Sequence, residues 1–256
     1  MEDKYKPIYF FNDTDQKNKK LFGEEGTRLI EMTKQGVHVK SGFIVTSTMC
    51  LLFYDNQEKL LQFLMSEIRA AMWKLEKITG KIYGDSLNPL FVSINSSPPV
   101  SIHGMIESIS NLGLNDSTVL GLIKQKYNQQ TVWESYVKFI ISFSTIVLEI
   151  GRDTFKEIKE DKQEINHNFS NRKQDQYLIL IKKMKSLIKE KYNIDFPDDP
   201  YKQLELSISA IFKSWMGKKA VEYRHQYGIT KEIADGTAII VCEMVFDNIG
   251  KDNWDT

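Results

Sequence analysis

Cysteine is scarce in this sequence, with two residues among 256. Cys50 and Cys242 lie far apart, and each sits inside an apolar run. This arrangement predicts buried, reduced thiols, and it excludes the small secreted domains that disulfides hold together. Histidine is also rare, at positions His38, His103, His167 and His225. These four share no metal-ligand spacing, so we expect no zinc site.

A charge excess and a long apolar run are missing too. The 34 basic and 34 acidic residues cancel, so no overall field attracts nucleic acid or an anionic membrane. Crossing a bilayer takes a run of about 18 apolar residues, and the sequence contains no such run. The segment Met1–Phe11 is charged and is not followed by the apolar core of a secretion signal. We therefore expect a cytoplasmic protein without nucleic-acid or membrane partners.

The sequence does contain clear helix and strand patterns. Apolar residues at helical spacing predict helices over Gln57–Thr79, Thr131–Ile150, Tyr177–Tyr192, Pro200–Met216, a short stretch ending before Gly228 and, more briefly, Gly104–Leu112. Apolar runs bounded by turn residues predict strands over Gly42–Val45, Leu87–Asn95 and Thr237–Phe246, with a turn at Pro98 after the second. With 41% hydrophobic residues, the chain can fill one large domain or two lobes. The mixture indicates an α+β or α/β arrangement.

A helix start and a weakly periodic segment divide the second half of the chain. Asp199 is well placed to cap a helix that begins at Pro200. The segment Arg152–Asp175 is charged, rich in asparagine and weakly periodic, so we expect a mobile connection there.

A glycine-bounded loop is predicted near the N-terminus, at Lys20–Gly26, followed by a short helix over Thr27–Lys34. Such a loop can cradle a phosphate, because a helix N-terminus presents free N–H groups and partial positive charge. A plain turn has the same pattern, and spacing alone leaves both interpretations open.

Several long motifs, in the same order along the chain, resemble the N-terminal region of the pyruvate phosphate dikinase family. Lys20–Met32 (KLFGEEGTRLIEM) is similar to the family's LLGGKGANLAEM, and Gly36–Phe43 to its GLPVPPGF. Asn88–Asn95 and Val100–Asp116 are similar to the stretches around PLLVSVRSG and VSMPGMMDTVLNLGLND. Further matches follow at Trp133–Tyr136, Phe212–Trp215, Tyr223–Arg224, Gly236–Ala238 and Glu243–Phe246.

The resemblance implies an α+β fold, a two-lobed ATP-grasp-like domain with a helical insert. Residues 1–120 would form the lobe with the glycine-bounded loop, 121–205 the mainly helical insert, and 206–256 the return to the α/β lobe. In the family this region holds ATP and Mg²⁺ and passes a phosphoryl group to a histidine on a separate domain. Neither that domain nor the pyruvate-binding barrel lies within these 256 residues. We expect a phosphotransferase-like chain that is not catalytic alone.

Two departures from the family motifs bear on ATP. The family's glycine-loop lysine falls on Glu25, and its arginine after the valine-rich strand falls on Asn95. A cation about 5 Å from a phosphate contributes roughly 3 kcal/mol at an effective dielectric near 20, and a carboxylate reverses the sign. The family's metal-holding residues would follow Gly250, where this sequence has only Lys251–Thr256. We expect ATP binding to be weak or lost, and the metal site to be missing.

Some family contacts have counterparts in this sequence. The resemblance places Glu243, Met244 and Val245 at the hinge strand, where ATP-grasp proteins bind adenine through the backbone. A buried strand without a ligand is the alternative. Arg224 matches a Tyr-Arg pair and would contact phosphate, or else form a salt bridge between lobes. No catalytic residue is assigned.

Three functional hypotheses stay open at this stage. The chain is a degenerate pseudo-domain, with a binding or regulatory role or none. Alternatively, it is the nucleotide-binding subunit of a split dikinase, completed by separately encoded domains. As a third possibility, it is an interaction or structural module. The last strand, Thr237–Phe246, would then lie at an unprotected sheet edge and favour self-association.

Overall fold

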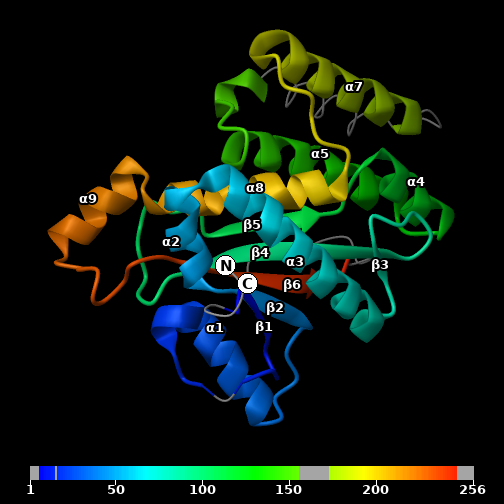
Figure 1. Cartoon of the computed structure of the whole chain (residues 1–256). Helices are drawn as coiled ribbons and strands as arrows, with labels where there is room; N and C mark the ends of the chain where they lie inside the picture. The colour runs from blue at the N-terminus through cyan, green and yellow to red at the C-terminus, as the bar shows by residue number, and fades with distance from the viewer. Residues whose placement is uncertain (1–5, 15, 156–172, 247–256) are drawn as a thin grey trace. The chain divides into compact units, whose positions relative to one another are not determined.

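The computed structural model describes residues 6–14, 16–155 and 173–246 (Figure 1). These residues form two compact units. The sheet unit is formed by the described residues of Met1–Tyr83, Leu90–Leu112 and Leu204–Met244, and the helical unit by those of Gly84–Pro89, Gly113–Gln203 and Val245–Thr256. Helices and strands are mixed, as an α+β fold requires, and no helix in the described part is long and apolar enough to span a membrane.

The sheet unit is built on six strands in the order β1-β2-β6-β4-β3, with β5 paired to β4. Their bounds are β1 Ile8–Phe10, β2 Gly42–Val45, β3 Ile82–Tyr83, β4 Pro89–Ser97, β5 Ser108–Leu112 and β6 Ala238–Met244. The pairs β1–β2, β2–β6, β6–β4 and β4–β5 are all antiparallel.

Strand β6 lies in the interior of this sheet. Ile240 pairs with Ile44 of β2 on one side and with Asn95 of β4 on the other. The expectation of an unprotected edge at Thr237–Phe246 is therefore wrong. Residues Ala238–Cys242 are buried between β2 and β4, which explains why the strand is apolar along most of its length.

Five helices accompany the sheet: α1 Lys19–Lys34, α2 Ser47–Asp55, α3 Gln57–Thr79, α9 Lys218–Gln226, and α8 Pro200–Trp215 from Leu204 onward. Helix α1 lies on the opposite side of the sheet from α2 and α3 (Figure 1). Its Phe22 and Ile30 pack with Ile44 and Ile240 in a buried cluster, and α2 and α3 are joined at Asn56. The sheet is thus covered on both faces.

Helix α3 confirms the predicted range at both ends. The Asn56 side chain accepts a hydrogen bond from the Lys59 backbone N–H at 3.1 Å, and Gly80 ends the helix in the left-handed conformation at φ 68°. These are the ordinary start and stop signals of a helix.

The predicted short helix over Gly104–Leu112 is wrong, because this segment contains strand β5. Ile109 and Leu112 are both buried although they are three residues apart. The ladder with β4 shifts its register between Val92 and Ile94, and Asn111 adopts a positive φ of 62°. A bulge of this kind turns a strand so that residues with helix-like spacing reach the same face.

The helical unit contains α4 Asp116–Lys124, α5 Gln129–Ile146, a 3₁₀ turn at Arg152–Phe155, α7 Lys173–Tyr192 and the first turn of α8. Helices α5, α7 and α8 confirm the predicted helices, with ends that differ by up to four residues. Asp199 caps α8 as predicted, since its carboxylate accepts from the Tyr201 N–H at 3.0 Å. Most of the predicted mobile connection, residues 156–172, lies outside the described residues.

A fully buried glutamine holds the connections of the helical unit together. The side-chain oxygen of Gln203 accepts from the Gly113 N–H, and its amide nitrogen donates to the carbonyls of Leu114 and Pro197, each at 2.9 Å. Nearby, Lys185 bridges Asp116 and Asp198 at 3.0 and 2.7 Å. The side chain of Gln203 therefore satisfies three backbone groups of two segments that no ladder pairs.

We expect Gln203→Ala to lower the free energy of unfolding by about 2–4 kcal/mol, because three buried backbone groups lose their partners. Urea unfolding followed by circular dichroism measures the change. The matched control is Gln130→Ala on exposed α5 surface, where we expect about 0.5 kcal/mol or less. Equal effects of the two substitutions would contradict the role of Gln203.

The two cysteines are free and buried, as predicted. Burial raises the pKa of each thiol, Cys50 and Cys242, to about 12. At pH 8 only about one molecule in 10⁴ then carries a given thiolate. We expect both thiols to resist a thiol reagent such as DTNB in the folded chain and to react within seconds in guanidinium chloride. A fast-reacting thiol in the folded protein would contradict this burial.

Candidate functional site

The first helix is broken at Gly23. This residue has φ 73° and ψ 177°, whereas the residues before and after it are helical. A Cβ atom at this position would lie 1.8 Å from the carbonyl oxygen of Ser97, so only glycine fits. The predicted loop over Lys20–Gly26 is therefore wrong: helix α1 begins at Lys19, bends at Gly23 and starts again at Glu24.

The end of strand β4 caps the second segment of α1. The Glu24 N–H donates to the Pro98 carbonyl at 2.9 Å, and the Gly26 N–H donates to the Ser97 Oγ at 3.0 Å. The Ser97 hydroxyl in turn donates to the Phe22 carbonyl at 3.1 Å. Gly23 has no side chain with which to cap the second segment of α1, so Ser97 of strand β4 supplies the capping oxygen.

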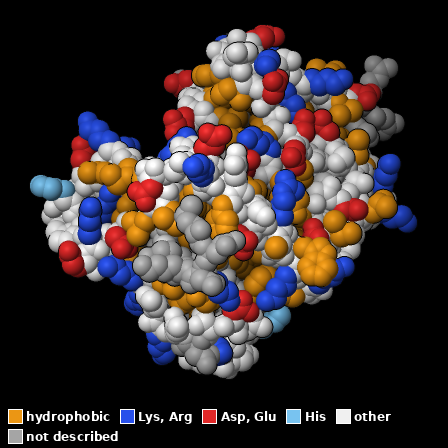
Figure 2. Space-filling view, viewed as in Figure 1, with side chains coloured by type: hydrophobic (Ala, Val, Ile, Leu, Met, Phe, Trp, Pro, Cys, Tyr) orange, Lys and Arg blue, Asp and Glu red, His pale blue; other side chains and the backbone are white. Residues whose placement is uncertain are grey.

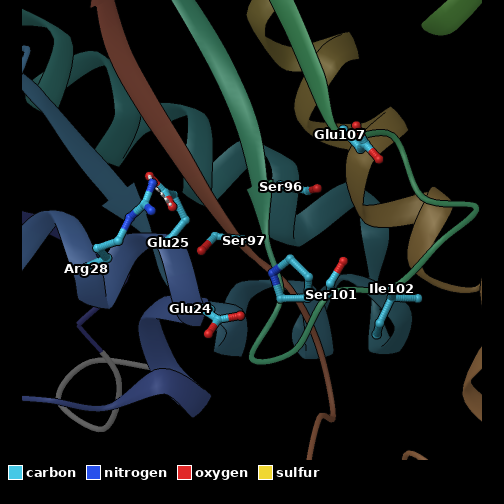
Figure 3. Close-up of a pocket in the computed structure, with 9 residues that line it drawn as sticks. Glu24, Glu25, Arg28, Ser96, Ser97, Ser101, Ile102 and Glu107 are labelled. Carbon is cyan, nitrogen blue, oxygen red and sulfur yellow. Dashed lines mark hydrogen bonds and ion pairs between the residues drawn. The ribbon is translucent and has the colours of Figure 1, made fainter. Parts of the chain in front are cut away.

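A pocket of about 390 Å³, which we call the α1–β4 pocket, opens beside this junction (Figure 3). It lies within the sheet unit. Its lining comes from three segments: α1, the end of β4 and the turn that leads to β5. The residues are Glu24, Glu25, Arg28, Ser96, Ser97, Pro98, Ser101, Ile102 and Glu107.

The charges of the α1–β4 pocket are mainly negative. Glu24, Glu25 and Glu107 contribute three carboxylates, and Arg28 is the one cation among the nine lining residues. Figure 3 shows Arg28 turned to Glu25, whose carboxylate it contacts at 2.8 Å. Glu24 pairs with Lys19 at 3.2 Å outside the pocket. The arrangement suits a cation better than a polyphosphate.

The two positions where the family motifs carry cations lie differently in the structure. Glu25 lines the α1–β4 pocket. Asn95 is half-buried within β4, opposite Ile240 of β6 and Ser108 of β5, and is not among the lining residues.

The predicted hinge residues are part of, or just beyond, the central strand. The Glu243 N–H donates to the Ser41 carbonyl at 2.8 Å, and its carboxylate pairs with Lys81 at the same distance. The sulfur of Met244 accepts from the Asn111 N–H at 3.2 Å. Val245 is 59% exposed and belongs to the helical unit. Their contact with adenine stays a prediction.

Arg224 on α9, the predicted phosphate contact, is held by Trp215 at the end of α8. Its guanidinium stacks on the Trp215 ring at 4.1 Å and donates to the Trp215 carbonyl at 2.6 Å. Burial lowers the pKa of this group. Arg224 does not line the α1–β4 pocket, so the structure does not bring it together with Glu25.

ATP and Mg²⁺, which the resemblance implies, do not fit the α1–β4 pocket well. Three carboxylates line it, and the N–H groups of Glu24 and Gly26 are already bonded to protein oxygens. In the described part of the chain, no group of three or more His, Cys, Asp or Glu side chains could hold a metal ion.

Comparison with known proteins shows similarity along almost the entire chain. A pyruvate, phosphate dikinase of Entamoeba histolytica is 40% identical over 255 residues, which is 96% of this chain and 28% of that protein. The enzymes of Clostridium symbiosum and Rhizobium meliloti are each 34% identical, over 95% and 89% of this chain. The predicted resemblance to the pyruvate, phosphate dikinases is confirmed. No protein-family model matches the chain.

The similarity to these dikinases covers only part of each relative. The chain spans 28%, 28% and 25% of the lengths of the three proteins, which is consistent with a match to their N-terminal region. The activity, substrates and partners of a complete dikinase are therefore a matter for proposal here.

Sequence reasoning singled out Glu25 but did not assign Ser97, Pro98 or Glu107 to the site. The turn at Pro98 was predicted, yet nothing in the spacing showed that it would meet a helix more than 70 residues earlier. The pair Gly23 and Gly26, three apart at the start of a helix, is the one local signal that another backbone approaches closely there.

We expect Ser97→Ala to lower the free energy of unfolding by about 1–3 kcal/mol, because the buried Gly26 N–H loses its acceptor. Ser96→Ala is the matched control, on the same strand and the same pocket, with an expected change of about 0.5 kcal/mol or less. Chemical denaturation of the two variants tests the difference. If Ser97→Ala were as stable as Ser96→Ala, the capping role of Ser97 would be refuted.

Proposed function

We propose that the chain is a dikinase-type nucleotide-binding domain that has lost productive ATP binding and acts as a non-catalytic binding or regulatory domain. The observation that carries this proposal is the charge of the α1–β4 pocket, whose lining residues include three carboxylates and one arginine that is already paired with Glu25. The similarity to pyruvate, phosphate dikinases supports the proposal that the domain derives from a dikinase.

The size of the electrostatic effect supports the loss of binding. A lysine about 5 Å from a phosphate contributes roughly 3 kcal/mol at an effective dielectric near 20, and a carboxylate at that place opposes binding by a similar amount. Solvent screening reduces both figures, because the Glu25 side chain is 42% exposed. A net loss of about 4 kcal/mol still converts a micromolar complex into a millimolar one.

The α1–β4 pocket also differs from a phosphate site in what its cation does. Arg28 projects from the turn after Glu25 and contacts the Glu25 carboxylate at 2.8 Å. A phosphate that approached the guanidinium would meet an ion pair rather than an isolated cation, and the nearby Glu25 carboxylate would repel it. The charge of Arg28 is therefore balanced by Glu25, and the lining residues include no unpaired cation.

Assembly with separately encoded dikinase domains and self-association are the two alternatives to this proposal. Self-association would be favoured by an open strand edge at β6, but that strand has a neighbour on each side. The negative charge of the α1–β4 pocket argues against a nucleotide-binding subunit of a split enzyme, because such a subunit would still need to bind ATP.

We expect wild-type chain to show no ATP binding with magnesium in calorimetry up to about 1 mM ligand. The double variant Glu25→Lys with Asn95→Arg should bind at least about tenfold more tightly, because both changes add positive charge along α1 and β4. Adding ATP should then raise the melting temperature of the double variant only.

Glu190→Lys with Gln130→Arg is the charge-matched control, since both positions are exposed helix surface in the helical unit. It should bind no ATP. Micromolar binding by the wild-type chain would refute the proposal, and so would a folded double variant that gains nothing over this control.

A further inference from the structure

We propose that Ser97 is a specificity-determining residue that closes the start of the second segment of α1 to anions. This inference rests on the proposed function, and it attributes part of the exclusion of ATP phosphates to the Ser97–Gly26 hydrogen bond rather than to charge. The feature that carries it is the capping of one helix by a buried serine from a strand that follows 71 residues later.

The first N–H groups of a helix are the donors that bind anions, because they have no partner inside the helix and lie at its positive end. In the second segment of α1, the first and third of these groups belong to Glu24 and Gly26. Both already donate to protein oxygens, at Pro98 and Ser97. Oxygen atoms of the chain itself thus already occupy two of the donors that anionic oxygens would use.

The Ser97 hydroxyl is fixed in this position from both sides. Its oxygen accepts from Gly26 at 3.0 Å, and its hydrogen is donated to the Phe22 carbonyl at 3.1 Å. Ser97 is 1% exposed, and it presses directly on Gly23, where a Cβ would lie 2.2 Å from the Ser97 Oγ. Rotation of the side chain away from α1 would leave two buried groups without partners.

This closure acts independently of the carboxylates. Replacing Glu25 and Asn95 by cations changes the sign of the local charge, but it leaves the Gly26 N–H bonded to Ser97. An anion attracted by the new cations would meet the capping oxygen instead of a free donor. Full phosphate binding therefore requires removal of the Ser97 hydroxyl as well.

The test adds Ser97→Gly to the Glu25→Lys, Asn95→Arg double variant and titrates ATP with magnesium by calorimetry. We expect the triple variant to bind about tenfold more tightly than the double variant, which is the gain of one charge-assisted hydrogen bond. Ser96→Gly in the same background is the matched control, because it lines the pocket and makes the same backbone change without a cap. It should leave the affinity unchanged.

Ser97→Ala serves as a second variant, since it removes the hydroxyl but keeps the Cβ, and circular dichroism confirms that each variant is folded. A triple variant that binds no better than the double variant, or a Ser96→Gly control with an equal gain, overturns the role of Ser97. A double variant that fails to bind beside a triple variant that binds contradicts the charge argument of the proposed function and supports the role of Ser97.

Discussion

The contact between Gly23 and Ser97 determines how the first helix meets the sheet. Because a side chain at position 23 would overlap the carbonyl oxygen of Ser97, the two backbones touch, and α1 must bend there. The bend places Glu24 and Glu25 in a new first turn, at the rim of the α1–β4 pocket. Carboxylates at a helix start interact favourably with the helix dipole. The segment is thus stable without any bound anion.

The same contact explains which parts of the fold the sequence could predict. Helix α3 was predicted from Gln57 to Thr79 because its signals are local, namely a long apolar stripe and a glycine stop, and the structure adds the Asn56 cap. Strand β5 was missed because its helix-like spacing comes from a bulge opposite β4, which no local pattern shows. The bend at Gly23 was interpreted as a loop for a similar reason, since its hydrogen-bond partners lie at Ser97 and Pro98.

In the candidate site too, local signals could be predicted from the sequence and long-range contacts could not. The importance of Glu25 could be predicted, because the family motif has a lysine at that position. The effect of Asn95 was less clear, since the residue lies within β4 and outside the lining of the pocket. Ser97 and Glu107 reach the pocket from segments on either side of a turn, and only the folded chain brings them to α1. Similarity alone would have left the internal cap unnoticed.

The position of β6 in the sheet has a consequence for how the chain folds during synthesis. Strand β6 lies between β2 and β4, yet most of the helical unit is synthesised after β4 and before β6. Until β6 has left the ribosome, β2 and β4 each expose an unpaired edge, and the cluster around Phe22 lacks Ala238, Ile240 and Cys242. The sheet can therefore be completed only after β6 has been synthesised, and the open edges of β2 and β4 need protection from aggregation while the helical unit is being made.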